Sequence, residues 1–236
     1  MEFLFFLILL FLVTMYCNRE GTTPNFKKGF KYLKKSAEQG VAEDQYNLGL
    51  FYYHGKGTTQ NYQKALKWYT KSAEQGFDLA QYNLGLSYYH GKGAPKNYQK
   101  AFEWFKKAAD QGVAEAQYNL GVIYAKGQGT TENDQKAFEW FKKAAKQGDA
   151  PAQHQLGDMY YWGESTTQNT EKSFEWYKKA ADQGHVQAQL NLGNMYHGGN
   201  GTTQNYQKAY THFLICDYLE DEQDTEKELI NELEQK

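Results

Sequence analysis

Apolar residues recur along the chain with a helical period, and the whole pattern returns every 36 residues. In the copy at residues 97–132, the apolar side chains of the first half are Tyr98, Ala101, Phe102, Phe105 and Ala109. Spacings of three, four and seven residues predict a helix with one broad apolar side. The pattern stops before Gly112, and glycine just past a helix supplies the left-handed capping conformation. We therefore expect a first helix that begins near Tyr98 and ends before Gly112.

A second helix is expected between Gly112 and the glycine loop that starts at Gly127. Its apolar positions are Ala116, Leu120 and Tyr124, which lie four residues apart on one side of a helix. Gly121 lies inside this helix, although an interior glycine costs about 0.5–1 kcal/mol relative to alanine. Because a glycine recurs there in every copy, we interpret it as a point where the two helices approach closely.

The register of the copies is strict over most of the chain. Five full units and a partial sixth cover residues 25–60, 61–96, 97–132, 133–168, 169–204 and 205–219. A period of roughly 20 to 50 residues indicates an array in which each unit stacks on its neighbours. Because no segment shows strand-like alternation, the sequence predicts an all-α solenoid.

One pass of the repeat carries a recognisable motif, A-x-x-x-L-G-x-x-Y-x-x-G-x-G followed by K-A-x-x-W-[FY]-x-K-[AS]-A-x-x-G. The match runs from Ala116 to Gly148 and includes Trp140. This motif resembles that of SEL-1-like repeats, which are relatives of the tetratricopeptide repeats. The resemblance implies a right-handed α/α solenoid of helix-turn-helix repeats that serves as a scaffold or adaptor for a protein or peptide partner.

The similarity to tetratricopeptide repeats also implies that a partner binds on a concave face formed by the second helices. Aromatic side chains suit such a face because they bury a large area with few rotatable bonds. The predicted partner-binding residues are Tyr46, Asn47, Tyr53, His54, Tyr82, Asn83, Tyr89, His90, Tyr118, Asn119, Lys126, His154, Tyr161 and Trp162. For Tyr46, Tyr82 and Tyr118, simple packing between units is the alternative.

Within the first helix, Trp104 lies with Ala101 and Ala108 at helical spacing. We expect its ring, and those of Trp140 and Trp176, to be buried between helices. Cys216 stands where other units have serine or alanine, so a buried inert thiol is expected.

The net charge and the spacing of candidate motifs restrict the classes of function that this chain can have. The formal net charge is −2 and the isoelectric point is about 6.3, with lysines interleaved among glutamates. Nucleic-acid binders typically carry a basic stripe, so that class is excluded. The segments around Lys56 and Lys92 lack the spacing of a phosphate-binding loop, and neither His54 nor His90 has metal ligands at the required spacing. We predict no enzyme, cofactor or metal; a small extracytoplasmic hydrolase of the SEL-1-like repeat type is the alternative.

The two ends differ from the repeats. Phe3 to Val13 is an unbroken apolar run, so residues 1–17 are predicted to be a signal peptide or a membrane anchor, followed by a linker at residues 18–24. Cleavage, retention and lipid attachment at Cys17 remain open, and export is expected. Residues 220–236 are acidic, and Thr225 and Glu228 have the spacing of a capping box. A C-terminal capping helix is expected there, with a partner-binding tail as the alternative; the oligomeric state is left open.

Overall fold

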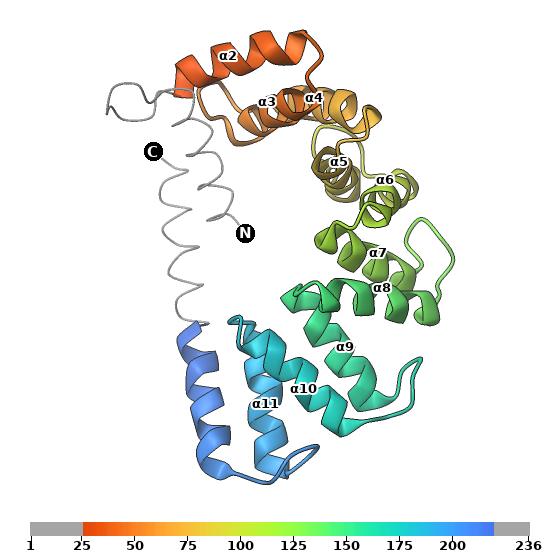
Figure 1. The fold of residues 1–236 in the computed structure, drawn as a ribbon, viewed down its shortest axis with the longest axis vertical. Helices are drawn as coiled ribbons and strands as arrows, with labels where there is room; N and C mark the ends of the chain where they lie inside the picture. The colour runs from red at the N-terminus through yellow and green to blue at the C-terminus, as the bar shows by residue number, and fades with distance from the viewer. Residues whose placement is uncertain (1–25, 220–236) are drawn as a thin grey trace. The chain divides into compact units, whose positions relative to one another are not determined.

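The computed structural model describes residues 26–219, and all regular secondary structure in that range is helical. The first helices of the repeats are α2 (Phe26–Glu38), α4 (Tyr62–Glu74), α6 (Tyr98–Asp110), α8 (Asp134–Lys146), α10 (Thr170–Ala181) and a further helix at residues 206–219. The second helices are α3 (Ala42–His54), α5 (Asp78–His90), α7 (Ala114–Lys126), α9 (Ala150–Trp162) and α11 (Val186–Gly198). Within each of two stretches, α2 to α6 and α7 to α11, every helix packs against the next in the chain (Figure 1), so the predicted all-α solenoid is confirmed.

The chain forms two compact units, Met1–Val113 and Ala114–Lys236. In the first unit, α2 to α6 pack in series, and in the second, α7 to α11 do the same. The predicted signal or anchor segment (1–17), the linker (18–24) and the C-terminal capping helix (220–236) lie outside the described residues.

The repeated asparagine begins the first helices from α4 onward. Asn97 lies just before α6 in an extended conformation, and its side-chain oxygen accepts a hydrogen bond from the backbone N–H of Lys100 at 2.9 Å. Asn61, Asn133 and Asn169 do the same in their repeats. An asparagine N-cap satisfies one of the backbone donors that a helix start leaves unpaired. The glycine that follows each first helix is left-handed, with φ of 96° at Gly112.

The glycine inside each second helix permits a close approach to the first helix of the following repeat. At Gly121, an added Cβ would lie 2.6 Å from the ring of Phe141, and at Gly85 it would lie 2.6 Å from the ring of Phe105. The expected close approach is therefore present. Its partner is the next repeat's helix, however, and not the first helix of the same repeat. This close packing thus joins one repeat to the next.

The prediction that the repeated tryptophans are buried is wrong. Trp104, Trp140 and Trp176 are half-buried, whereas the next residue along each helix, such as Phe105, is fully buried. A lysine one turn further on covers the exposed face of each tryptophan, with Lys107 Nζ 4.0 Å from the ring centre of Trp104. The tryptophan therefore lies at the edge of the apolar side of the helix, and the core position belongs to its neighbour.

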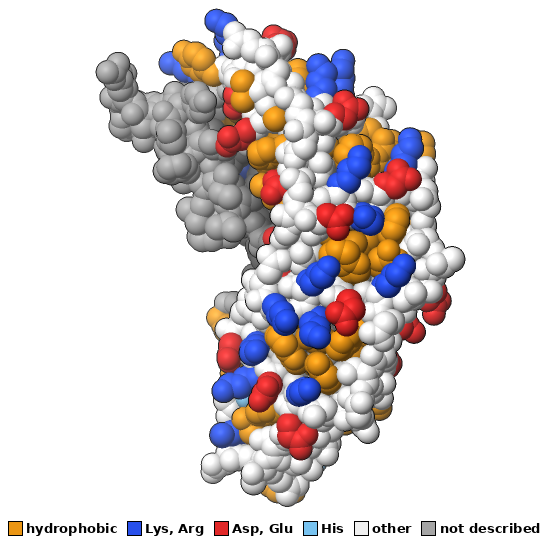
Figure 2. All heavy atoms as spheres, turned by 45° about the vertical axis from the view of Figure 1, so that its right-hand side comes forward, with side chains coloured by type: hydrophobic (Ala, Val, Ile, Leu, Met, Phe, Trp, Pro, Cys, Tyr) orange, Lys and Arg blue, Asp and Glu red, His pale blue; other side chains and the backbone are white. Residues whose placement is uncertain are grey.

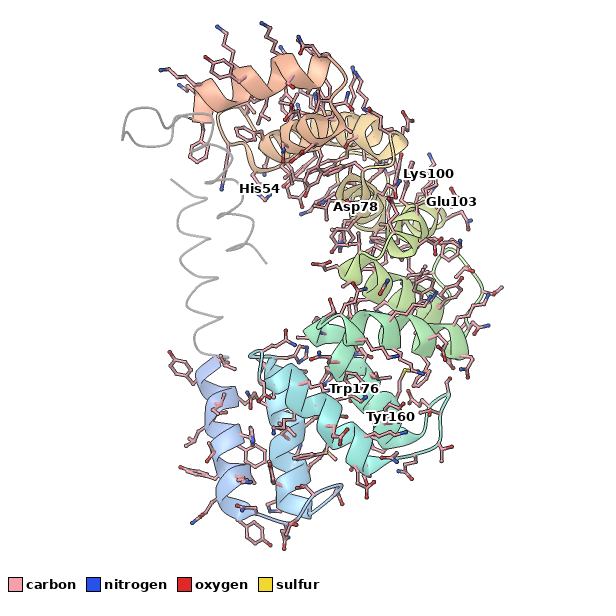
Figure 3. The ribbon with its side chains drawn as sticks, in the orientation of Figure 1. His54, Asp78, Lys100, Glu103, Tyr160 and Trp176 are labelled. Atoms are coloured by element: carbon pink, nitrogen blue, oxygen red, sulfur yellow. The ribbon has the colours of Figure 1, made fainter. Side chains whose placement is uncertain are left out.

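Charged side chains occupy the solvent-exposed sides of the first helices. Lys100 and Glu103 of α6 point into solvent (Figure 3). On the face shown in Figure 2, hydrophobic side chains gather in separate patches with lysines and acidic residues around them. Cys216 is buried at 4% exposure, which confirms its expected core position.

Candidate functional site

The predicted partner-binding residues all lie on second helices, and the structure gives them unequal exposure. Tyr46, Tyr82 and Tyr118 are half-buried. Their ring centres lie 5.7–6.0 Å from those of the fully buried aromatic residues that follow in the next first helix, Tyr69, Phe105 and Phe141. These three tyrosines therefore pack between helices, which was the alternative drawn from the sequence, and keep only one edge accessible.

The predicted asparagines divide into two groups. Asn47 is 3% exposed, so the prediction that it offers an amide to a partner needs correction: its side chain has almost no accessible surface. Asn83 and Asn119 are half-buried, and their side-chain N–H groups donate to backbone carbonyls one turn earlier, at Leu79 (3.0 Å) and Glu115 (2.8 Å). How deeply each asparagine is buried depends on the residues that pack around it, and the helical period does not reveal this.

In the first unit, a hollow of about 190 Å³ opens between the ends of α3 and α5. Tyr53, Asn83, His90 and Lys92 are among its lining residues. The ammonium group of Lys92 lies 5.0 Å from the ring centre of Tyr53 and donates a 2.7 Å hydrogen bond to its hydroxyl oxygen. That hydrogen bond raises the pKa of Lys92. The hollow thus holds a cation that the chain itself supplies.

The remaining predicted residues of this unit take part in local ring contacts. Tyr89 packs edge-on against Tyr98, at 5.3 Å between ring centres, and also contacts Phe105 at 6.3 Å. His54 and His90 each meet the ring of the preceding tyrosine, and Figure 3 shows His54 at the end of α3. Tyr89 therefore contributes to packing between helices, and the sequence pattern alone placed it outside the core.

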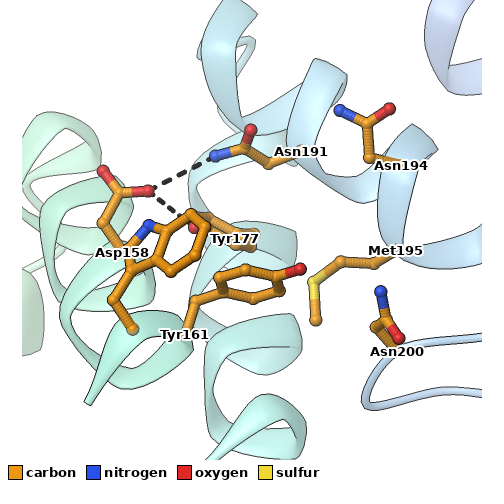
Figure 4. A pocket seen from close by; sticks show the side chains of 8 residues that line it. Asp158, Tyr161, Tyr177, Asn191, Asn194, Met195 and Asn200 are labelled. Atoms are coloured by element: carbon orange, nitrogen blue, oxygen red, sulfur yellow. Dashed lines mark hydrogen bonds between the residues drawn. The ribbon is translucent and has the colours of Figure 1, made fainter. Parts of the chain in front are cut away.

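The second unit has a pocket of about 210 Å³ at the corresponding place, between α9 and α11 (Figure 4). Five of its eight lining residues stand three repeats after residues that line the first hollow, with Tyr161 for Tyr53 and Asn191 for Asn83. Of the predicted residues, Tyr161 and Trp162 line this pocket. The sequence prediction missed Tyr177, Asn191 and Asn200 as site residues.

A polar network forms the inner wall of this pocket. The Tyr177 hydroxyl donates a 2.6 Å hydrogen bond to Oδ1 of Asp158, and Nδ2 of Asn191 lies 3.5 Å from the same oxygen (Figure 4). Burial and the hydrogen bond to Asp158 raise the pKa of Tyr177 well above its usual value, so the phenol stays protonated and donates. Asp158 therefore faces the pocket as a carboxylate that neighbouring donors hold in place.

Behind the carboxylate, two histidines stack on each other. His154 and His185 have ring centres 4.7 Å apart, and Nδ1 of His154 lies 3.5 Å from Oδ2 of Asp158. Burial lowers the pKa of both histidines. The predicted residue His154 thus supports the pocket from behind, with a side chain only 13% exposed.

Trp162, Lys126 and His90 are the exposed members of the predicted set. Trp162 is 67% exposed and meets Tyr161 edge-on at 4.8 Å between ring centres. Lys126 is exposed at the end of α7. Within residues 26–219, no three His, Cys, Asp or Glu side chains are grouped so as to hold a metal ion, and no helix there has the length and apolarity to cross a membrane. The described site consists of aromatic rings, amides and one carboxylate, which is a composition suited to binding.

Pairs of helices that repeat and pack in series define an α-helical repeat protein of the solenoid class. The Sel1 repeat model matches residues 9–41, 42–77, 78–113, 114–149, 150–185 and 186–215, and the chain belongs to the Sel1 repeat family. The resemblance noted in the sequence is therefore confirmed. Proteins of this family are in general protein-binding scaffolds.

Solved structures of similar proteins support this family assignment. A protective antigen of uropathogenic Escherichia coli strains, c5321, which displays an SLR fold, is 36% identical, with a TM-score of 0.82 over 89% of this chain and 45% of that chain. This chain thus spans less than half the length of that protein. A Sel1 repeat protein from Oxalobacter formigenes is 31% identical, with a TM-score of 0.77 over 89% of this chain and 82% of that chain.

A more distant structure, the immunity protein Pa5087 from Pseudomonas aeruginosa, is 22% identical, with a TM-score of 0.52 over 87% of this chain and 79% of that chain. It shares the fold. No curated protein matches this chain.

Proposed function

We propose that this protein is an exported, non-enzymatic scaffold that binds a peptide or a protein segment along its second helices. The observation that carries the proposal is the hollow lined with aromatic and amide side chains that recurs between consecutive second helices, at Tyr53 and Asn83 and again at Tyr161 and Asn191. Helical repeat arrays bind partners on extended surfaces built from equivalent positions. Export rests on the apolar run of residues 3–13.

We favour the second-helix face as the binding surface because lysine side chains cover the repeated tryptophans of the first helices. On the first helices, a lysine lies over each repeated tryptophan, with Nζ 3.8 Å from the ring centre of Trp140 and 4.1 Å from that of Trp176. In the described part of the chain, no lysine lies over Trp162, which is 67% exposed. An uncovered tryptophan is a strong anchor for a partner because tryptophan is enriched among the residues that dominate binding energy.

The test is photo-crosslinking from the second-helix face in the organism that makes the protein. A photoreactive phenylalanine analogue replaces Trp162 in one variant and Tyr210 in the control, since Tyr210 is similarly exposed (64%) on a first helix. We expect a discrete crosslinked protein from position 162 and not from position 210. The purified partner should then bind Trp162→Ala at least tenfold more weakly, or about 1.4 kcal/mol, and Tyr210→Ala normally. Equal binding by both variants would refute the proposed face.

A further inference from the structure

The two hollows differ in one respect that bears on the ligand: the first contains a lysine of the chain itself, and the second does not. Lys92 occupies the first hollow, over the ring of Tyr53. Three repeats later the corresponding residue is Asn200, whereas the ring is retained as Tyr161. The second pocket therefore keeps the aromatic wall against which an ammonium packs in the first.

Two further differences make the second pocket more favourable for a cation. Asp158 replaces Leu50, and Trp162 replaces His54. A carboxylate favours a nearby positive charge, and tryptophan is the aromatic side chain that attracts cations most strongly through its ring face. The pocket has therefore lost its own cation and gained a negative charge and a larger ring.

The charge of Asp158 is not balanced by a cation of the protein. Across residues 26–219, no lysine or arginine lies within ion-pair distance of it. Its basic neighbour is His154, and burial lowers the pKa of that imidazole, which favours the neutral form. The Asp158 side chain is 29% exposed, so a ligand can reach it from the pocket.

The size of the pocket and the geometry of its carboxylate restrict which cation it can bind. Drug-sized ligands occupy pockets of about 300–1,000 Å³, whereas this pocket measures about 210 Å³. It has room for one side chain. Oδ1 of Asp158 accepts from Tyr177 and lies near Asn191, and Oδ2 lies 3.5 Å from Nδ1 of His154, so each oxygen already has a neighbour. The carboxylate is therefore not open to a two-pronged contact, which suits an ammonium better than arginine, because the planar fork of arginine prefers both oxygens.

We propose that the pocket formed by Asp158, Tyr161, Trp162 and Met195 is a recognition site for a lysine side chain of the bound partner. The ammonium would approach the Asp158 carboxylate beside the Trp162 ring, and the alkyl chain would pack against Tyr161 and Met195, as lysine stems do on apolar surfaces. The identity of the ligand as part of a protein rests on the proposed function; the affinity of the pocket for an alkylammonium group does not.

The first experiment measures the pocket alone. The ¹⁵N-labelled protein is titrated with n-butylammonium chloride and, as a neutral match, with 1-butanol, while the indole N–H signal of Trp162 is followed. We expect a saturable shift with n-butylammonium that Asp158→Asn weakens at least tenfold, since asparagine keeps an acceptor for Tyr177 but removes the charge. Glu175→Gln, an exposed acid on α10, is the control and should bind normally. Equal binding of the amine and the alcohol would overturn the proposal.

The second experiment identifies the source of the cation. Arrays of dodecapeptides with random flanks and a central lysine, arginine, acetyl-lysine or norleucine are probed with the wild type and Asp158→Asn. A lysine preference that disappears in Asp158→Asn supports the proposal. Peptide binding without that preference overturns it and leaves the proposed function standing. Binding of n-butylammonium without binding of any peptide overturns the protein partner instead, and assigns the pocket to free amines.

Discussion

The close packing of Gly85 against Phe105 can be tested by a change that would stabilise an ordinary helix. Gly85→Ala removes an interior glycine, which by itself should stabilise α5 by about 0.5–1 kcal/mol. The new Cβ, however, would lie 2.6 Å from the Phe105 ring. Overpacking of this kind costs roughly 1–3 kcal/mol. We therefore expect Gly85→Ala to destabilise the protein by roughly 1 kcal/mol, the difference between the middles of these two ranges.

The effect of Gly85→Ala on stability should change from destabilising to stabilising when the Phe105 ring is removed. Phe105 is fully buried, so Phe105→Ala alone should cost about 3–5 kcal/mol. In that background, Gly85→Ala has no ring to displace and should stabilise the protein by about 0.5–1 kcal/mol. The two changes should therefore couple by an energy on the order of 1–3 kcal/mol.

Urea unfolding, followed by both far-UV circular dichroism and tryptophan fluorescence, measures these free energies. Coincidence of the two transitions is needed, because repeat arrays depart from two-state behaviour more readily than compact domains. Gly198→Ala is the control. This glycine is exposed in α11, and the atoms nearest to its added Cβ belong to the flexible Asn200 side chain, so stability should rise or stay unchanged. If Gly85→Ala stabilised the wild type as Gly198→Ala does, close helix approach would not explain the glycine.

Two other predictions concern burial and pH. Because Trp104 is only half-buried, thermal or urea unfolding should show that Trp104→Ala costs about half as much as Phe105→Ala, or roughly 2 kcal/mol; an equal or larger cost would contradict the assigned core position. The lowered pKa values of His154 and His185 mean that the fold favours their neutral forms, so stability is fully present above about pH 6.5 and is lost as the pH falls towards the folded-state values. His154→Tyr with His185→Phe, which reproduces the Tyr46–Phe77 contact of the first unit, should flatten the melting temperature between about pH 7.5 and 5.5; an unchanged slope would show that other groups control it.

The sequence alone determined the elements of this protein and their order. The 36-residue period located each helix, and apolar positions such as Ala116 and Leu120 proved fully buried. These features follow from local chemistry: a helical stripe fixes which side of a helix is apolar, glycine fixes where it ends, and the repeat fixes the stacking. For the same reason the family resemblance could be drawn from one motif.

The neighbours of each side chain were decided only by tertiary structure. The apolar stripe includes both Trp104 and Phe105, but adjacent residues on a helix point about 100° apart, and only packing decides which one enters the core. The partners of the buried glutamines were likewise decided by packing. Gln111 donates to buried Gln81 at 2.8 Å and Gln147 to buried Gln117 at 2.8 Å, so polar residues join one repeat to the next.

The pocket shows the same division between sequence and structure. Tyr161 and Trp162 were identified from their position in the repeat, whereas Tyr177 and Asn191 lie on two other helices, α10 and α11, and were not identified. A helical period describes the direction of a side chain about its own axis. It carries no information on which residues of other helices share a cavity, because that depends on how the helices pack against one another.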